Sequence, residues 1–295
     1  MEIIKKHLID AYRQNSNVAS LILVPSPISS RPLIEGTNAL VIVVQHEAAD
    51  NKSLEHVIVR QQKIVITTLS KAELCSRLQS GIEVNSSVME WLVRGEILLD
   101  TDAYWANTRK EILSFPENLR EMRCFKEFSL FLQTYMQAKQ FLNDGHVLDA
   151  YSNILQALHH WAHIVLIEEG IRPELTVWKQ LRRVHPGVYK LYEELSASPE
   201  TIEQRVQLVM LACEFTVMNK MKSSCEFLFK IMREQEEPWS MTQLREHPKL
   251  EPMQLELSLV IQKLVTRSYI EEVAVMSSDK EDWMELCYKV GDQAS

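Results

Sequence analysis

Apolar residues follow two different patterns along the chain, with short runs before residue 117 and helical spacing after it. Short apolar runs bounded by polar loops are typical of buried strands. Such runs occupy residues 19–24, 40–44, 54–60, 63–68 and 96–100. Helical spacing occurs between them at residues 2–15, 70–78, 86–94 and 102–115. The first part of the chain therefore predicts a small mixed sheet covered by helices.

Polar and glycine residues mark the ends of these elements. The turn between the third and fourth strands is predicted at Gln61 and Gln62. Ser70 is expected to cap the helix that follows, because its hydroxyl can accept hydrogen bonds from first-turn amides. Gly95 is expected to end the next helix, and Thr101 or Asp102 to cap the helix after it.

After Glu117 the apolar residues recur every three or four positions, which predicts an antiparallel helical bundle. The expected helices cover residues 119–143, 146–169, 176–196 with a break at Pro186 and Gly187, and 201–234. The tail has the order of a winged helix. A short helix starts at Ser240, a third helix covers residues 255–267, and two alternating strands at 269–276 and 283–290 flank a polar wing tip.

These patterns predict an α+β protein with three domains. A small mixed-sheet domain covers residues 1–116, an antiparallel helical bundle covers 117–236, and a winged-helix-like domain covers 237–295.

Two sequence motifs carry a family resemblance. The first, Arg94-Gly-Glu-Ile-Leu-Leu-Asp100, follows a helix containing Trp91 and is typical of small nucleotidyltransferases. The second, Asp149-Ala-Tyr-Ser-Asn-Ile-Leu-Gln-Ala-Leu-His-His160, is followed by Thr176-Val-Trp178. With both motifs, the chain resembles the YgxA-type nucleotidyltransferase-like proteins of Gram-positive bacteria over nearly its whole length. The resemblance implies a nucleotidyltransferase-fold head, a substrate-binding or HEPN-like bundle, and a winged-helix-like tail.

The resemblance also implies a metal site whose ligands this chain lacks. Active members carry Asp-x-Asp at the start of the second strand, because two Mg²⁺ ions bind the triphosphate there. Gly36, Thr37 and Asn38 stand at those positions here, and residues 63–68 offer no third carboxylate. We therefore expect a catalytically degenerate protein, a pseudoenzyme without a cofactor, that binds a nucleotide, a nucleic acid or a protein partner.

Two other functions stay open. The first is an active nucleotidyltransferase, in which non-standard residues bind the Mg²⁺ and nucleotide. Glu35 is the weak candidate for such a metal ligand, together with Glu47 or Asp50. The third interpretation is a winged-helix DNA-binding regulator. Residues 238–295 carry six Lys and Arg against ten Asp and Glu, so we favour protein contact for the tail.

A polar stripe on one predicted helix is the first candidate ligand-binding site. Its members, spaced three or four residues apart, are Asp149, Asn153, Gln156, His160 and His163. The alternative is that these residues form the ordinary solvent face of an amphipathic helix. The residues turned inward would then be Ala150, Ile154, Ala157, Leu158, Trp161 and Val165. His159 and His163 have the spacing of a chelating pair, but no Glu ligand lies near them on that face, so we predict no metal. We expect any ligand site between head and bundle, with an anion bound by the loop residues Ser29, Ser30 and Arg31.

A basic stretch beside three aromatic residues is the second candidate. Its cations are Lys179, Arg182, Arg183, His185 and Lys190. Next to Trp178, Tyr189 and Tyr192 they suit a nucleotide or a single-stranded nucleic acid, unless the aromatic rings simply point into the core. Arg182 and His185 have the residue types of a HEPN ribonuclease, but their spacing is wrong.

Composition sets the remaining limits. The net charge of −8 argues against indiscriminate coating of nucleic acid. The five cysteines are scattered without a Cys-x-x-Cys pair, so neither a zinc knuckle nor a disulfide framework is indicated. No apolar run has the length of a membrane span and the first residues lack a secretory h-region, so we expect a cytoplasmic protein without membrane contact. The family resemblance implies that the protein is bacterial.

Overall fold

The computed structural model describes residues 2–25, 36–47, 54–79, 87–174, 176–216, 218–253, 255–276 and 283–294. The chain divides into two compact units, Met1–Pro116 and Glu117–Ser295. Each unit is described by itself. No helix among the described residues combines the length and apolar character needed to cross a membrane.

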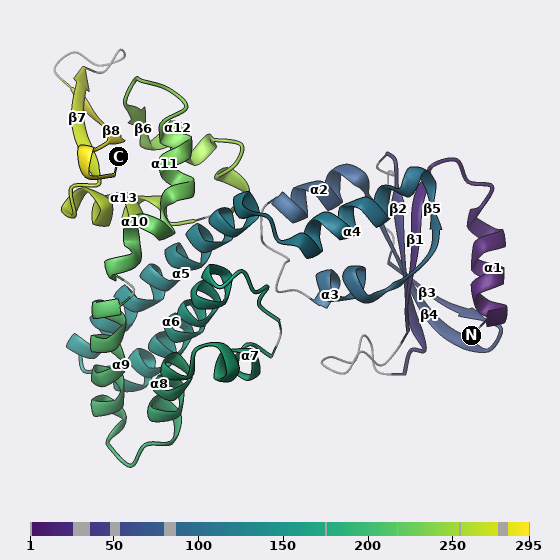
Figure 1. The fold of residues 1–295 in the computed structure, drawn as a ribbon, viewed down its shortest axis with the longest axis horizontal. Helices are drawn as coiled ribbons and strands as arrows, with labels where there is room; N and C mark the ends of the chain where they lie inside the picture. Colours follow the sequence, from purple (N-terminus) through teal and green to yellow (C-terminus); the bar gives the residue numbers. More distant parts are fainter. Residues whose placement is uncertain are drawn as a thin grey trace. The chain divides into compact units, whose positions relative to one another are not determined.

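The first unit is built on a five-stranded mixed sheet (Figure 1). Its strands are β1 (Val18–Pro25), β2 (Ala39–Gln45), β3 (Leu54–Val59), β4 (Gln62–Ser70) and β5 (Glu96–Asp100). They lie in the order β3-β4-β2-β1-β5. Only the β2–β4 pair is parallel, with Ala39 opposite Ile64, and the other pairs are antiparallel.

Helices cover both faces of this sheet, as Figure 1 shows. On one face, α1 (Glu2–Tyr12) packs Ile4 and Leu8 against Leu21 and Val41. The other face is covered by α2 (Lys71–Gln79), α3 (Ser87–Arg94) and α4 (Tyr104–Ser114), whose core includes Leu74, Leu92 and Trp105. Strands buried on both faces need apolar residues at every position, which explains the continuous runs in β1 and β2.

Local details of the first unit correct two predictions. The turn between β3 and β4 lies at Arg60 and Gln61, both with positive φ, one residue earlier than expected. Ser70 does cap α2, with its Oγ 3.0 Å from the amide nitrogen of Glu73. The predicted cap of α4 by Thr101 or Asp102 is wrong, because the carboxylate of Asp100 accepts the amides of Trp105 and Ala106, both at 2.9 Å.

The second unit begins with two long antiparallel helices, α5 (Glu117–Asn143) and α6 (Val147–Glu168), which pack along each other. The remaining helices are α7 (Val177–Val184), α8 (Pro186–Ala197), α9 (Ile202–Thr216), α10 (Met221–Ser224) and α11 (Glu226–Met232). The break predicted at Pro186 and Gly187 lies one residue earlier, at His185 between α7 and α8. The predicted continuous helix over residues 201–234 is wrong, because a 3-10 turn, η2 (Met218–Lys220), interrupts it.

The C-terminal part has winged-helix topology. It contains β6 (Trp239–Ser240), α12 (Met241–Glu246), α13 (Leu257–Thr266), β7 (Ile270–Met276) and β8 (Met284–Val290). The strands pair in the order β6-β8-β7. Residues 277–282, the predicted wing tip, lie outside the described residues. In α13 the buried side chains are Leu257, Val260, Ile261 and Leu264. Leu255, Leu259 and Val265 are half-buried.

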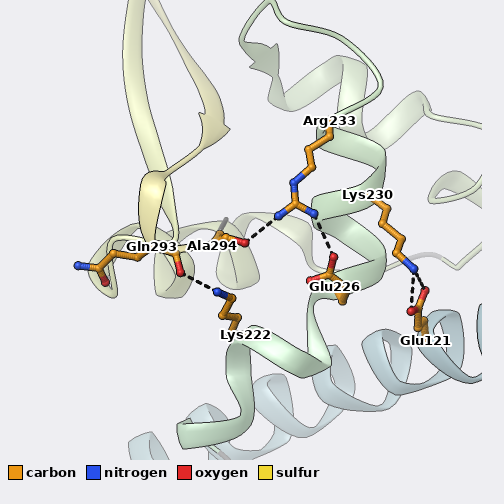
Figure 2. Close-up of polar contacts among 7 residues, drawn as sticks. All are labelled: Glu121, Lys222, Glu226, Lys230, Arg233, Gln293 and Ala294. Atoms are coloured by element: carbon orange, nitrogen blue, oxygen red, sulfur yellow. Dashed lines mark hydrogen bonds and ion pairs between the residues drawn. The ribbon is translucent and has the colours of Figure 1, made fainter.

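Polar contacts join α11 to α5, and join the last turn of the chain to α10 and to the end of α11 (Figure 2). Lys230 of α11 forms an ion pair with Glu121 of α5 at 2.6 Å. The last turn, η4 (Asp292–Ala294), receives hydrogen bonds from Lys222 to the carbonyl of Gln293 at 3.0 Å and from Arg233 to the carbonyl of Ala294 at 2.7 Å. The predicted α+β fold is confirmed: a mixed sheet with helices, a helical middle part and a winged-helix-like C-terminal part.

Candidate functional site

A buried carboxylate and two histidines form a well-defined polar cluster in the helical unit. Glu127 lies on α5, and His160 and His163 lie one turn apart on α6. The Nδ1 atom of His160 is 2.7 Å from Oε2 of Glu127, and the Nδ1 atom of His163 is 3.0 Å from Oε1. Each carboxylate oxygen therefore contacts a different imidazole ring.

Burial and hydrogen bonding act in opposite directions on this carboxylate. The side chain of Glu127 is only 12% exposed, and desolvation acts to raise its pKa. The hydrogen bonds with His160 and His163, and the positive charge these rings can carry, outweigh burial and hold the pKa of Glu127 well below its usual range. Arg123, buried one turn earlier on α5, interacts electrostatically with Glu127. Glu127 is therefore an ionised group enclosed between the two long helices.

An aromatic pocket lies beside this cluster and shares His160 with it. Its volume is about 320 Å³, and its lining residues are Leu155, Gln156, His159, His160, Trp178 and Tyr192. Trp178 of α7 stacks on Tyr192 of α8, with ring centroids 4.2 Å apart and planes inclined by 21°. His159 meets Trp178 edge-on, with centroids 5.8 Å apart. Three helices thus supply one wall of rings.

His159 is an uncharged part of that wall at neutral pH. Burial, followed by repulsion from His163 and His160, lowers the pKa of His159 to about 4. Its ring also packs against His163, with centroids 4.5 Å apart in an edge-on arrangement. The pocket and the buried cluster are therefore in direct contact through two histidine side chains.

The predicted polar stripe on α6 divides along its length. Asp149 is exposed at the start of the helix and Asn153 is half-buried. The side-chain amide of Asn153 donates a hydrogen bond to the backbone carbonyl of Asp149. Gln156 and His160 line the pocket, whereas His163 is buried and contacts Glu127. The stripe is therefore not a uniform solvent face. Its apolar counterpart was predicted correctly, since Ala150, Ile154, Ala157, Leu158, Trp161 and Val165 are all buried.

The residues of the basic stretch lie on the helices around the pocket but do not line it. Lys179, Arg182, Arg183, His185 and Lys190 are all exposed. His185 has a structural role, because its Nδ1 accepts the amide of Val188 at 3.3 Å at the start of α8. The guanidinium of Arg182 lies 5.7 Å from the centre of the Tyr189 ring. The aromatic residues Trp178 and Tyr192 are half-buried and open to the pocket.

In the first unit, the positions of the expected Asp-x-Asp have taken other roles. Asn38 precedes β2, and its side-chain oxygen accepts the amide of Lys63 at 2.9 Å while its own amide donates to the Lys63 carbonyl at 2.8 Å. Gly36 has a positive φ of 87°. Ser29, Ser30, Arg31, Glu35 and Asp50 lie outside the described residues, and their proposed roles stay predictions. Glu47 follows β2, and its backbone amide donates to the side-chain oxygen of Asn17 at 3.1 Å.

Within the described ranges, the group with donor atoms close enough for a shared metal ion is Glu127 with His160 and His163. The sequence did not reveal Glu127, because helical periodicity relates residues within one helix and Glu127 comes from another. A weak signal was present, since Glu127 stands between the buried residues Phe125 and Phe128.

Comparison with known proteins assigns all three parts of the chain to families. Residues 1–120 match the nucleotidyltransferase-like family, residues 121–220 match the YgxA-like substrate binding domain, and residues 226–290 match a helix-turn-helix domain. The cluster and the pocket both lie within the second of these ranges.

Two similar proteins extend these matches over almost the whole chain. The uncharacterized protein YgxA of Bacillus subtilis (strain 168) is 27% identical over 270 residues, covering 92% of this chain and 91% of that protein. The crystal structure of a nucleotidyltransferase-like protein from Exiguobacterium sibiricum 255-15 is similar with a TM-score of 0.86 and 25% identity, covering 98% of this chain and 99% of that one.

Proposed function

We propose that the chain, which is similar to the YgxA-like nucleotidyltransferase-like proteins, binds a nucleotide in its helical domain and transfers no nucleotidyl group. The observation that carries the proposal is the aromatic pocket formed by Trp178, Tyr192 and His159. It lies in the part of the chain that matches the YgxA-like substrate binding domain.

The pocket has the chemistry that a nucleobase requires. A base can stack on the ring wall of Trp178 and Tyr192, and stacking contributes about 1–3 kcal/mol per base. The volume of about 320 Å³ is at the small end of ligand pockets, which favours one mononucleotide over a longer segment. Gln156 and His160 offer polar groups at the same surface, and the exposed cations Lys179, Arg182 and Lys190 lie on the helices that carry Trp178 and Tyr192.

The head supports a non-catalytic role. Nucleotidyl transfer by this fold needs paired carboxylates that hold Mg²⁺ on the triphosphate. Asn38 is a neutral amide whose oxygen already accepts a backbone hydrogen bond from Lys63. A carboxamide in this structural role is a poor Mg²⁺ ligand, because Mg²⁺ surrenders its waters reluctantly and prefers charged oxygens.

Nucleotide binding is tested by equilibrium dialysis with AMP, GMP, CMP and UMP in the presence of EDTA. The intact chain should bind at least one of them, and Trp178→Ala should weaken binding by about 5- to 150-fold, the loss expected for one stacked base. Trp283→Ala, which changes an exposed tryptophan in the tail, is the matched control and should leave affinity unchanged. Equal binding by the two variants, or no binding by the intact chain, contradicts the proposal.

Loss of catalysis is tested with labelled nucleoside triphosphates and Mg²⁺. No incorporation into RNA, protein or small-molecule acceptors is expected. Metal-dependent turnover that disappears in Glu35→Gln would establish the alternative, an active enzyme with a non-standard ligand.

A second candidate function, DNA binding by the tail, is favoured by the match of residues 226–290 to a helix-turn-helix domain. The excess of carboxylates over cations in residues 238–295 argues against it.

A further inference from the structure

We propose that Glu127, His160 and His163 form a binding site for a divalent transition-metal ion, with Zn²⁺ as the representative ion. One donor atom from each residue lies within 4.8 Å of the others. Two imidazoles and one carboxylate are a ligand set that Zn²⁺ and related ions bind in proteins, and an ion with three protein ligands keeps a position open for water. Mg²⁺ does not suit this set, because it prefers oxygen ligands throughout.

The distances between Glu127 and each histidine are close to those around a bound ion. Ligand atoms that surround one Zn²⁺ at roughly 2.0–2.2 Å stand about 3 Å apart. Nδ1 of His160 and Nδ1 of His163 lie 2.7 and 3.0 Å from the two oxygens of Glu127. The ligand atoms of the three residues all lie within 4.8 Å of one another, so an ion that binds all three takes the place of the protons in these hydrogen bonds.

The surrounding structure holds the three ligands in place. His160 and His163 lie one turn apart on α6, and the α5–α6 packing places Glu127 opposite both of them. The edge-on ring of His159 contacts His163 on another side. Preorganised ligands lower the entropy cost of binding a metal, because the side chains are already ordered before the ion arrives.

Neighbouring cations limit the affinity. Arg123 is buried one turn before Glu127, and Lys126 is the residue next to it. Their positive charges oppose a dication by Coulomb repulsion, which is strong in a partly desolvated site. We therefore expect dissociation constants on the order of micromolar, weaker than those of structural zinc sites.

The site adjoins the pocket because His160 belongs to both. Metal binding at the cluster does not require nucleotide binding in the pocket. Metal binding is measured without nucleotide, and nucleotide binding is measured in EDTA, so either result can fail while the other holds.

The experiment uses the full chain without a histidine tag, freed of metal by chelating resin. Zn²⁺ is titrated by calorimetry, and Co²⁺ is titrated by its visible d–d absorption, which reports the ligand geometry directly. One ion per chain is expected. Glu127→Gln and His160→Gln should each weaken binding by at least about tenfold and remove the Co²⁺ spectrum, because each lacks one ligand.

His146→Gln is the matched control, since His146 is an exposed histidine at the start of the same helix and is not one of the three ligands. It should bind Zn²⁺ within about twofold of the parent chain. Circular dichroism of the metal-free variants identifies any that fail to fold, and His160→Gln, at a half-buried position, carries the test if Glu127→Gln does not fold. No Zn²⁺ binding by the parent chain at 100-fold over the expected constant, competition by Mg²⁺, or equal loss in His146→Gln overturns the proposal.

Discussion

Gly95 shows how a single residue can be required for packing and not for backbone conformation. Gly95 was predicted to end α3 and does so, without a positive φ. Its amide closes the helix by donating to the Trp91 carbonyl at 2.7 Å. A Cβ atom here would lie 2.4 Å from Cγ2 of Ile22 and 2.8 Å from the Trp91 oxygen. The close approach of α3 to β1 therefore excludes any larger side chain.

Gly95→Ala is expected to destabilise the chain by about 1–3 kcal/mol, the usual cost of forcing an extra carbon into a packed core. Urea unfolding monitored by circular dichroism measures it. Gly187→Ala is the matched control, because a Cβ at Gly187 meets nothing nearer than 3.5 Å and its φ is not positive. That change should be neutral or slightly stabilising, and equal effects at the two glycines would contradict the packing explanation.

The five cysteines are expected to differ in reactivity, because they differ in exposure. Cys75 is exposed, whereas Cys124, Cys213, Cys225 and Cys287 are buried. Burial raises the pKa of Cys124 to about 11 and also raises the pKa values of Cys213 and Cys225. Thiolates are the reactive form, so buried thiols with raised pKa values react slowly.

Titration with Ellman's reagent should therefore find one fast thiol in the native chain and five in denaturant. Cys75→Ser should abolish the fast reaction. Two or more fast thiols in the native parent chain would show that a cysteine placed in the core is accessible.

At the scale of elements, capping residues and terminal contacts decide how the tail is held. Ser240 and Gln243 form a reciprocal capping box at the start of α12. Arg233 at the end of α11 contacts both Glu226 and the Ala294 carbonyl, which ties the last turn of the chain to this helix (Figure 2). The C-terminal turn is thus fixed by a side chain that lies about 60 residues earlier in the sequence.

Arg233→Ala is expected to lower the stability of the second unit by about 1.5–3 kcal/mol, the range for hydrogen bonds made by charged groups. Differential scanning calorimetry of the full chain measures it as a shift in the transition of that unit. Arg267→Ala, an exposed change at the end of α13, is the control and should stay within about 0.5 kcal/mol. A smaller loss for Arg233→Ala than for the control would exclude a stabilising role for these contacts.

At the scale of the whole molecule, charge and packing argue together against DNA recognition by the tail. The tail is net acidic, with six cations and ten carboxylates in residues 238–295. The third helix of a winged helix normally reads DNA, but α13 packs against α5 as well as β7. Part of its surface is therefore already covered within the unit.

A binding assay on random and genomic duplexes between 50 and 300 mM salt should find no specific complex, because several phosphate contacts are needed for steep salt dependence. Lys263→Ala and Arg267→Ala should change nothing. Specific binding that falls steeply with salt and weakens in either variant would establish a regulator in place of a protein-contact domain. Removal of residues 238–295 should instead lower stability or partner binding.

The sequence by itself determined the order and type of nearly all elements, because these depend on local periodicity, capping residues and the identity of single side chains. Continuous apolar runs at residues 19–24 and 40–44 predicted strands, and the sheet has strands there, β1 and β2. The i,i+3 and i,i+4 spacing of residues 149–163 likewise predicted which side of α6 is apolar.

Only the tertiary structure decided which residues from different elements meet. Glu127 and His160 are 33 residues apart in the sequence. The first-turn amides of α4 donate to the carboxylate of Asp100 and not to Thr101 or Asp102, the residues predicted to cap the helix. Periodicity relates side chains within one element, whereas the packing of α5 on α6 fixes contacts between elements. The cluster of Glu127, His160 and His163, and the pocket that shares His160, are therefore properties of the fold and not of any single segment.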